Sequence, residues 1–308
     1  MHDTLPTVVS RSLAAAALAL AVGACSGGLF GGGGPKTTPT VGEREPILSR
    51  IESGAAVDPA LAGVTVVLPQ PSANAEWAQA GGTADKSYGH LAIAETPTRA
   101  FTVSVAGSTK QRRLAAAPVV GGGKLFAVGT DGMVSAFSSV NGQRLWTYRA
   151  QLSDDLKPSA FGGGVSYDGG RLFGTDGAGN VYALDAETGA QLWVTQPAGP
   201  LRGSPTVAFD NVFVMTQDNQ IFALDTTDGS LEWQEGASGT MAGVFGVASP
   251  AAGQGTVVAG YTSGELVAYR YENGRNLWAD ALAQTSISTQ VGTLNDIDAD
   301  PIIDSGRV

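Results

Sequence analysis

Few side chains in this sequence could do catalytic chemistry, and their identity limits the possible reactions. The 308 residues include one cysteine, Cys25, and two histidines, His2 and His90. A histidine-based metal site or a catalytic triad needs imidazole groups held beside other reactive side chains, and one cysteine cannot form an intramolecular disulfide. We therefore predict no catalytic residues, no cofactor and no histidine-ligated metal.

Acidic side chains recur in two similar runs, Asp185–Gly189 and Asp225–Gly229, and their oxygens could coordinate calcium. The alternative is a tight turn, in which an aspartate accepts hydrogen bonds from the backbone that follows it. The glycine that closes each run supports a turn, because glycine adopts the left-handed backbone conformation without strain. We favour the turn and predict no metal site.

Cys25 has the clearest chemical context of these residues. An apolar run from Leu13 to Val22 follows Arg11, the only Lys or Arg before it. The run is too short to span a membrane and is typical of a signal peptide. The sequence Val-Gly-Ala-Cys that ends at Cys25 resembles a lipobox, so we predict a lipoprotein signal peptide over residues 1–24 and acylation of the cysteine. An ordinary signal peptide followed by an incidental cysteine is the alternative.

Two further segments precede the main body of the chain. Residues 25–42 are rich in Gly, Pro and Thr, which predicts a flexible tether that starts at the acylated cysteine. Ser26, directly after that cysteine, favours release to the outer membrane under the lipoprotein sorting rule. Residues 43–76 form an N-terminal segment, in which apolar spacing predicts one short helix and alternation predicts a strand over Val64–Leu68.

A repeat organises residues 77–308. A thirteen-residue motif that ends in tryptophan occurs four times, with glycine four residues and alanine ten residues before the tryptophan. Self-similarity at a period of 40 to 47 residues predicts a repeat fold. The four tryptophans are Trp146, Trp193, Trp233 and Trp278.

Each motif predicts a strand, a tight turn and a second strand. Apolar and small residues precede the turn, glycine occupies it, and the tryptophan opens the strand that follows. The first of these strands is apolar on both faces, so neighbouring sheets should cover both. We predict an all-β fold, a β-propeller of four-stranded blades in which the tryptophans pack in the seams between blades.

Two markers extend the repeat toward its N-terminal side. A proline stands 28 residues before three of the tryptophans and predicts the start of a strand. In the second repeat Pro158 stands 35 residues before Trp193, which predicts a seven-residue insertion near residues 161–170. Phe101 stands 45 residues before Trp146 and is predicted to fill the tryptophan position of a degenerate blade.

The C-terminal end of the sequence falls inside a further repeat. Pro301 begins another strand, and its tryptophan would lie beyond Val308. A propeller that closes on itself does not end on such an exposed, incomplete blade. We predict an incomplete chain that holds four to five blades of a propeller of about eight.

The charge of the chain limits its partners. The formal net charge is −10, and only 15% of the residues are charged. Nucleic-acid-binding proteins carry basic surfaces, so we predict no nucleic-acid partner.

Three features resemble the BamB family of outer-membrane protein assembly factors, which are lipoproteins built from PQQ-like, WD40-like β-propeller repeats. The first is the lipobox with its tether. The second is the sequence Trp77–Gly82, just before the first blade. The third is the segment Ser288–Pro301, which matches the family's pattern of Ser-Thr, Leu, Asp-x-Asp and Pro. Quinoprotein dehydrogenases share the repeat, but the third feature is more specific.

The resemblance implies a non-catalytic scaffold that is lipid-anchored at the periplasmic face of the outer membrane. Such a scaffold would bind the periplasmic domains of the central, BamA-like β-barrel assembly subunit and help with unfolded outer-membrane protein clients. The resemblance places partner contacts at Asp296 and Asp298. A second contact loop maps to residues 241–247, which contain no arginine, so its contacts would be apolar and made by Val244 and Phe245.

Two other classes of protein stay open as alternatives. A PQQ-dependent dehydrogenase resembles these repeats, but that resemblance implies a calcium site and a disulfide of adjacent cysteines over the quinone. Cys25 alone cannot supply the disulfide. A periplasmic ligand-binding propeller is the second alternative.

Overall fold

The computed structural model describes residues 59, 63–65, 67–110, 112, 116–159, 161–201, 203–237, 248–281 and 296–308. The chain divides into two compact units, residues 1–66 and residues 67–308. The predicted signal peptide, the tether with Cys25 and the predicted short helix lie outside the described residues. All the sheets lie in the second unit.

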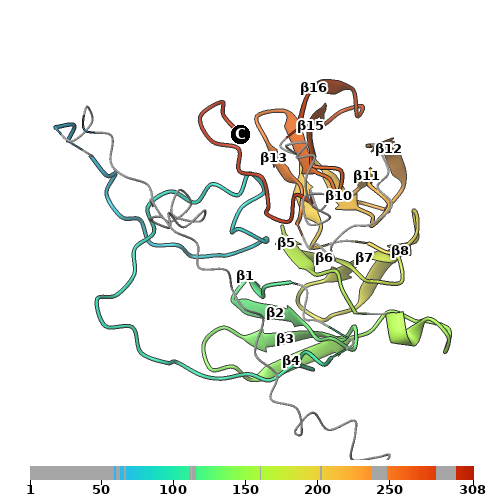
Figure 1. Ribbon diagram of the computed structural model, residues 1–308. Helices are drawn as coiled ribbons and strands as arrows, with labels where there is room; N and C mark the ends of the chain where they lie inside the picture. The colour runs from blue at the N-terminus through green and yellow to red at the C-terminus, as the bar shows by residue number, and fades with distance from the viewer. Residues whose placement is uncertain are drawn as a thin grey trace, which may run out of the picture. The chain divides into compact units, whose positions relative to one another are not determined.

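Four antiparallel sheets of four strands build the second unit, and they succeed one another in chain order (Figure 1). Within each sheet every strand pairs with the next along the chain, so each sheet is a simple meander. The prediction of an all-β propeller with four-stranded blades is confirmed. The strands are β1 (Val119–Gly121), β2 (Lys124–Val128), β3 (Val134–Ser138), β4 (Arg144–Tyr148), β5 (Val165–Asp168), β6 (Arg171–Thr175), β7 (Val181–Asp185), β8 (Gln191–Thr195), β9 (Thr206–Ala208), β10 (Asn211–Met215), β11 (Gln220–Asp225), β12 (Leu231–Gly236), β13 (Ala251–Gly253), β14 (Thr256–Gly260), β15 (Glu265–Arg270) and β16 (Asn276–Ala281).

The first strands of the sheets lie on the inside, where β5 contacts β1 and β9, and β9 contacts β13. The core lies between the sheets. For example, Phe213 and Ile221 of the third sheet pack in one cluster with Val257 and Tyr269 of the fourth. This arrangement explains why the middle strands are apolar on both faces, since a neighbouring sheet covers each side.

The tryptophans of the first three motifs each join their sheet to the next one. Trp193 is 8% exposed, and its Nε1 donates to the Thr226 carbonyl of the third sheet at 3.1 Å. A Cβ atom on Gly229 would lie 2.7 Å from the same ring, and the φ of Gly229 is +75°. Glycine is required there both by the turn and by the ring packed against it. The equivalent donations are from Trp146 to Ala186 and from Trp233 to Tyr271.

The two ends of this series differ from its middle. Phe101 packs against Gly142 in the place that a tryptophan takes in the later sheets, as its spacing predicts, although residues 101–105 form no strand. Trp278, on the last described strand, is 39% exposed. Within the described residues, the sheet series therefore begins with a packed phenylalanine and ends on a partly open tryptophan.

Two local predictions are wrong. No strand forms at residues 64, 65, 67 and 68, where Val64, Val67 and Leu68 are exposed, because alternation makes a strand only where a neighbouring strand pairs with it. Pro158 does not start a strand but lies in the short 3-10 helix η2 (Lys157–Ser159). The strand register places Val165 where the other sheets have proline, so the extra residues precede β5.

Candidate functional site

An extended segment over residues 76–87, the hub segment, hydrogen-bonds to the innermost strand of every described sheet. The backbone of Trp77 exchanges two hydrogen bonds with Val120 of β1, at 2.8 and 2.7 Å. The carbonyl of Ala78 accepts from the amide of Tyr167 in β5 at 2.7 Å. The hub segment therefore begins by completing the inner edges of the first two sheets.

The contacts continue around the remaining sheets in the same order. The Gln79 side chain donates to the Val207 carbonyl of β9 at 2.8 Å and accepts from its amide at 2.9 Å. The Ala84 carbonyl accepts from Ala252 of β13 at 2.8 Å, and the Asp85 carbonyl accepts from Ile303 at 2.9 Å. The hub segment thus makes hydrogen bonds to all four described sheets and to the segment that follows them. The Trp77–Gly82 motif is visible in the sequence, but its pattern alone does not predict this role.

Lys86 is the buried charged group of the hub segment, with 2% of its surface exposed. Its Nζ donates to Thr206 Oγ1 at 3.3 Å, and Thr206 donates in turn to the Pro250 carbonyl. Burial lowers the pKa of Lys86 from 10.5 to about 8, although the nearby carboxylates of Asp300 and Asp85 act in the opposite direction. A buried amine of this kind affects stability, which can be measured through its pH dependence.

Asp296 and Asp298 lie on a segment that packs against the fourth sheet. The amide of Ile297, between them, donates to the Tyr261 carbonyl at 3.2 Å, and its side chain lies against Gly260. Asp300 accepts from the amide of Ser249 at 2.7 Å. Asp296 is half-buried and Asp298 is exposed. Residues on both sides of Asp298 are therefore held, and Asp298 itself is exposed.

The hub segment also holds the C-terminal side of this acidic segment. Ile303 is buried in a cluster with Ala251, Val258 and Ala268 of the fourth sheet, beside the hydrogen bond that it makes to Asp85. The structure brings Asp296 and Asp298 to the same edge of the fourth sheet. Val244 and Phe245, the apolar residues expected to act with them, lie outside the described residues, as does Cys25.

The acidic turns act as turns. Asp185 accepts from the amide and the hydroxyl of Thr188, both at 2.7 Å, and this hydroxyl hydrogen bond is the main cause that lowers the pKa of Asp185. Asp225 accepts from the Thr227 amide at 2.6 Å in the equivalent turn. Across the described ranges, no group of three or more His, Cys, Asp or Glu side chains could hold a metal ion.

A known protein family matches more than half of this chain. The family described as outer membrane protein assembly factor BamB matches residues 130–308, which is more than half of the chain. The chain belongs to the BamB family. The match covers β3 to β16 together with the segment that carries Asp296 and Asp298.

Several BamB proteins are similar in sequence over part of their length. BamB of Moranella endobia is 27% identical over 196 residues, which are 62% of this chain and 50% of that protein. BamB of Escherichia coli (strain K12) is 27% identical over 216 residues, 69% of this chain and 55% of that protein. The chain therefore spans about half the length of the curated relatives it matches.

Solved structures show the same fold. BamB from Moraxella catarrhalis matches with a TM-score of 0.50 and 24% identity, over 66% of this chain and 58% of that one. Quinohemoprotein alcohol dehydrogenase from Comamonas testosteroni matches with a TM-score of 0.54 and 17% identity, over 67% and 41%. At these identities the likeness concerns the propeller architecture, which unrelated functions share.

The resemblance to quinoproteins implies a disulfide of adjacent cysteines and a calcium ion. The sequence has one cysteine, Cys25, and the part of the chain that the structure describes holds no cluster of three or more metal-ligating side chains. No helix among the described residues is long and apolar enough to cross a membrane.

Proposed function

We propose that this chain is a non-catalytic scaffold of outer-membrane protein assembly. The observation that carries the proposal is the BamB family match over residues 130–308. The partner would be the periplasmic domains of the central β-barrel assembly subunit, and unfolded outer-membrane proteins would be the clients. A propeller suits this role because its sheets form a rigid support for binding loops.

The docking surface in this proposal is the acidic segment at the fourth sheet. Asp298 is exposed, and the backbone on both sides of it is fixed by Ile297 and Asp300. A carboxylate held in this way loses little conformational entropy on binding, so it suits recognition of a basic side chain. Val244 and Phe245 would add apolar contacts next to it.

Attachment to the outer membrane would come from acylation of Cys25, with residues 25–42 as the tether. The acyl chains supply membrane affinity in proportion to the apolar groups they bury. The propeller would then stay at the periplasmic face, within reach of a partner embedded in the same membrane.

The docking proposal is tested by reversing both charges, Asp296→Arg with Asp298→Arg. Co-purification of the barrel-assembly subunit from detergent-solubilised outer membrane should fall, since reversal at a desolvated charge pair costs about 2–5 kcal/mol. The matched control is Asp168→Arg with Glu232→Arg, two exposed carboxylates on the second and third sheets. Circular dichroism and the melting temperature should be unchanged in both. Wild-type yield from the first variant, at low and high salt alike, would remove this surface from the proposal.

The fold likeness to quinohemoprotein alcohol dehydrogenases gives a second candidate, an enzyme of that class. Titration with PQQ and calcium tests it directly. A shifted quinone spectrum together with dye-linked alcohol oxidation would favour the enzyme over the scaffold. A ligand-binding propeller would instead bind a small molecule without turnover.

A further inference from the structure

Charge is unevenly distributed along this acidic chain. Residues 99–157 contain eight Lys or Arg and three Asp or Glu, whereas residues 158–308 contain five Lys or Arg and seventeen Asp or Glu. The first sheet and the segment before it are therefore basic, with a net charge of +5, and the remaining sheets are acidic, with a net charge of −12. Such segregation produces a local field that the overall charge conceals.

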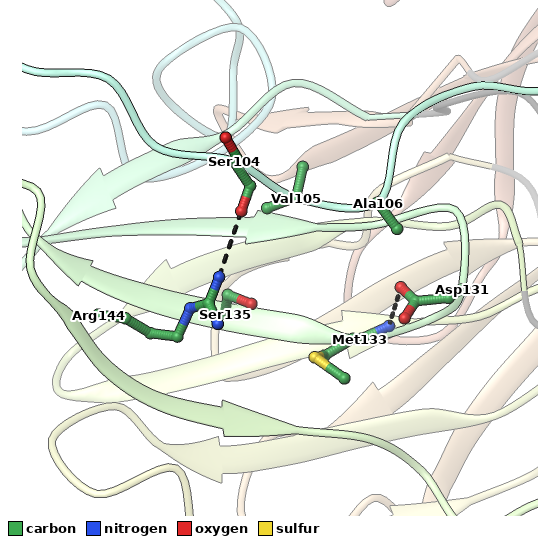
Figure 2. A pocket seen from close by; sticks show the side chains of 7 residues that line it. All are labelled: Ser104, Val105, Ala106, Asp131, Met133, Ser135 and Arg144. Atoms are coloured by element: carbon green, nitrogen blue, oxygen red, sulfur yellow. Dashed lines mark hydrogen bonds between the residues drawn. The ribbon is translucent and has the colours of Figure 1, made fainter.

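The basic side chains gather around two neighbouring hollows of the first sheet. One hollow, of about 230 Å³, is lined by Arg112, Arg149 and Lys157 and has Ala150 and Leu152 as apolar lining. The other, of about 130 Å³, is shown in Figure 2 and is lined by Arg144, Met133 and Val105. Asp131 lines both hollows, so they adjoin. We call the cations that line these hollows, Arg112, Arg144, Arg149 and Lys157, the basic rim, together with the exposed Lys110 two residues before Arg112.

The cations of the basic rim outnumber the carboxylates that face them. Asp131 forms an ion pair with Arg149, and Asp154 pairs with Lys157 at 2.6 Å. The loop that carries Arg112 is fixed by the amide of Thr109, which donates to the Arg112 carbonyl at 2.7 Å. The first hollow is therefore lined by three cations and two carboxylates, Asp131 and Asp154, so it carries an excess of positive charge.

The basic rim lies on the same face of the propeller as the acidic segment. It surrounds the β2–β3 turn and the connection from β4 to β5. Ile297, between the two acidic residues, bonds to Tyr261 at the equivalent β14–β15 turn of the fourth sheet. A flat anionic membrane that met this face would also meet Asp298 and be repelled by it, whereas a shaped protein partner would not.

We propose that the basic rim binds an acidic segment of a protein partner. Carboxylates of that segment would pair with Arg112 and Lys110, and an adjacent apolar side chain would enter the hollow over Leu152. The mixed lining favours this ligand over a bare anion, because the hollow offers apolar surface as well as charge. The proposal does not depend on which protein binds Asp296 and Asp298.

The test compares two charge reversals that change the net charge equally. Lys110→Glu with Arg112→Glu alters the basic rim, and Arg270→Glu with Arg275→Glu alters the fourth sheet. The probe is a fluorescein-labelled peptide of glutamates and leucines, followed by anisotropy at low salt. Binding should weaken at least about tenfold in the rim variant and stay at the wild-type value in the control. Arg112→Gln, which removes charge without reversing it, should give an intermediate loss.

Three results would overturn the proposal. Equal peptide affinity in the rim and control variants would show that Lys110 and Arg112 are not part of a binding surface. Competition by inorganic phosphate as strong as that by unlabelled peptide would indicate a simple anion site. Rim-dependent binding to phosphatidylglycerol vesicles, without binding of the peptide, would identify the ligand as a membrane.

Discussion

Replacing Lys86 by methionine should stabilise the protein at neutral pH. The pKa of Lys86 is about 8 in the folded protein, against 10.5 for an ordinary lysine. Each pKa unit corresponds to about 1.4 kcal/mol, so keeping this amine charged and buried costs about 3 kcal/mol at pH 7. The hydrogen bond to Thr206 is lost in the variant and is worth about 1 kcal/mol. The free energy of unfolding should therefore rise by about 2 kcal/mol.

The pH dependence of this gain identifies its cause. Between pH 8 and pH 10.5 the unfolded chain holds the Lys86 proton more tightly than the folded protein does, so wild-type stability rises with pH in that window. The cost is fully present below pH 8 and absent above pH 10.5. The advantage of Lys86→Met should therefore shrink steadily across the window and end near zero or slightly negative.

Urea unfolding of the wild type and the variant at pH 7 and pH 10 measures both effects. Lys157→Met is the control, because Lys157 is exposed, and its substitution should change stability by less than about 0.5 kcal/mol. The half-buried Tyr148, whose pKa burial raises to about 12, titrates in the same way in all the proteins, so its effect cancels in the comparison. A Lys86→Met variant that is less stable at pH 7, or a difference that does not change with pH, would refute this account of the buried amine.

Two further predictions concern the seams and the anchor. Trp193→Ala should lower the free energy of unfolding by about 3–5 kcal/mol, because it leaves a cavity in a buried seam, whereas Trp278→Ala should lower it much less in this chain, since Trp278 is 39% exposed. Denaturant midpoints of the two variants compare these losses, and equal losses would contradict the assignment of Trp193 to a seam. Cys25→Ala should move the protein from the membrane to the soluble periplasmic fraction, and continued membrane association in cells that lack its partner would contradict acylation at this residue.

The repeat could be predicted from sequence because its signals are local. Each turn glycine, such as Gly229, stands four residues before a tryptophan, and its positive φ is a local backbone requirement that the sequence shows directly. Phe101 could be placed for the same reason, since its spacing to Trp146 follows the repeat. The strand expected at Val64–Leu68 failed because its pattern carries no information about a pairing partner.

The hub segment could not be predicted because its contacts are not periodic. Gln79 bonds to Val207, a residue 128 positions away, and Lys86 contacts Thr206 at a similar separation. A sequence pattern shows which residues share a face but not which distant strand they meet. The glycines Gly81 and Gly82, both with positive φ, were the available signal that an unusual backbone path lies there.

The hub segment fixes the acidic segment and the basic rim relative to each other. In a repeat fold each sheet contacts only its neighbours, so small movements accumulate from one end to the other. Here one short segment bonds to Val120 in the first sheet and to Ala252 in the fourth, which ties the ends together directly. The distance between Asp298 and the basic rim should therefore vary little. A partner that engages both would meet a preorganised pair of opposite charges, and this lowers the entropic cost of binding.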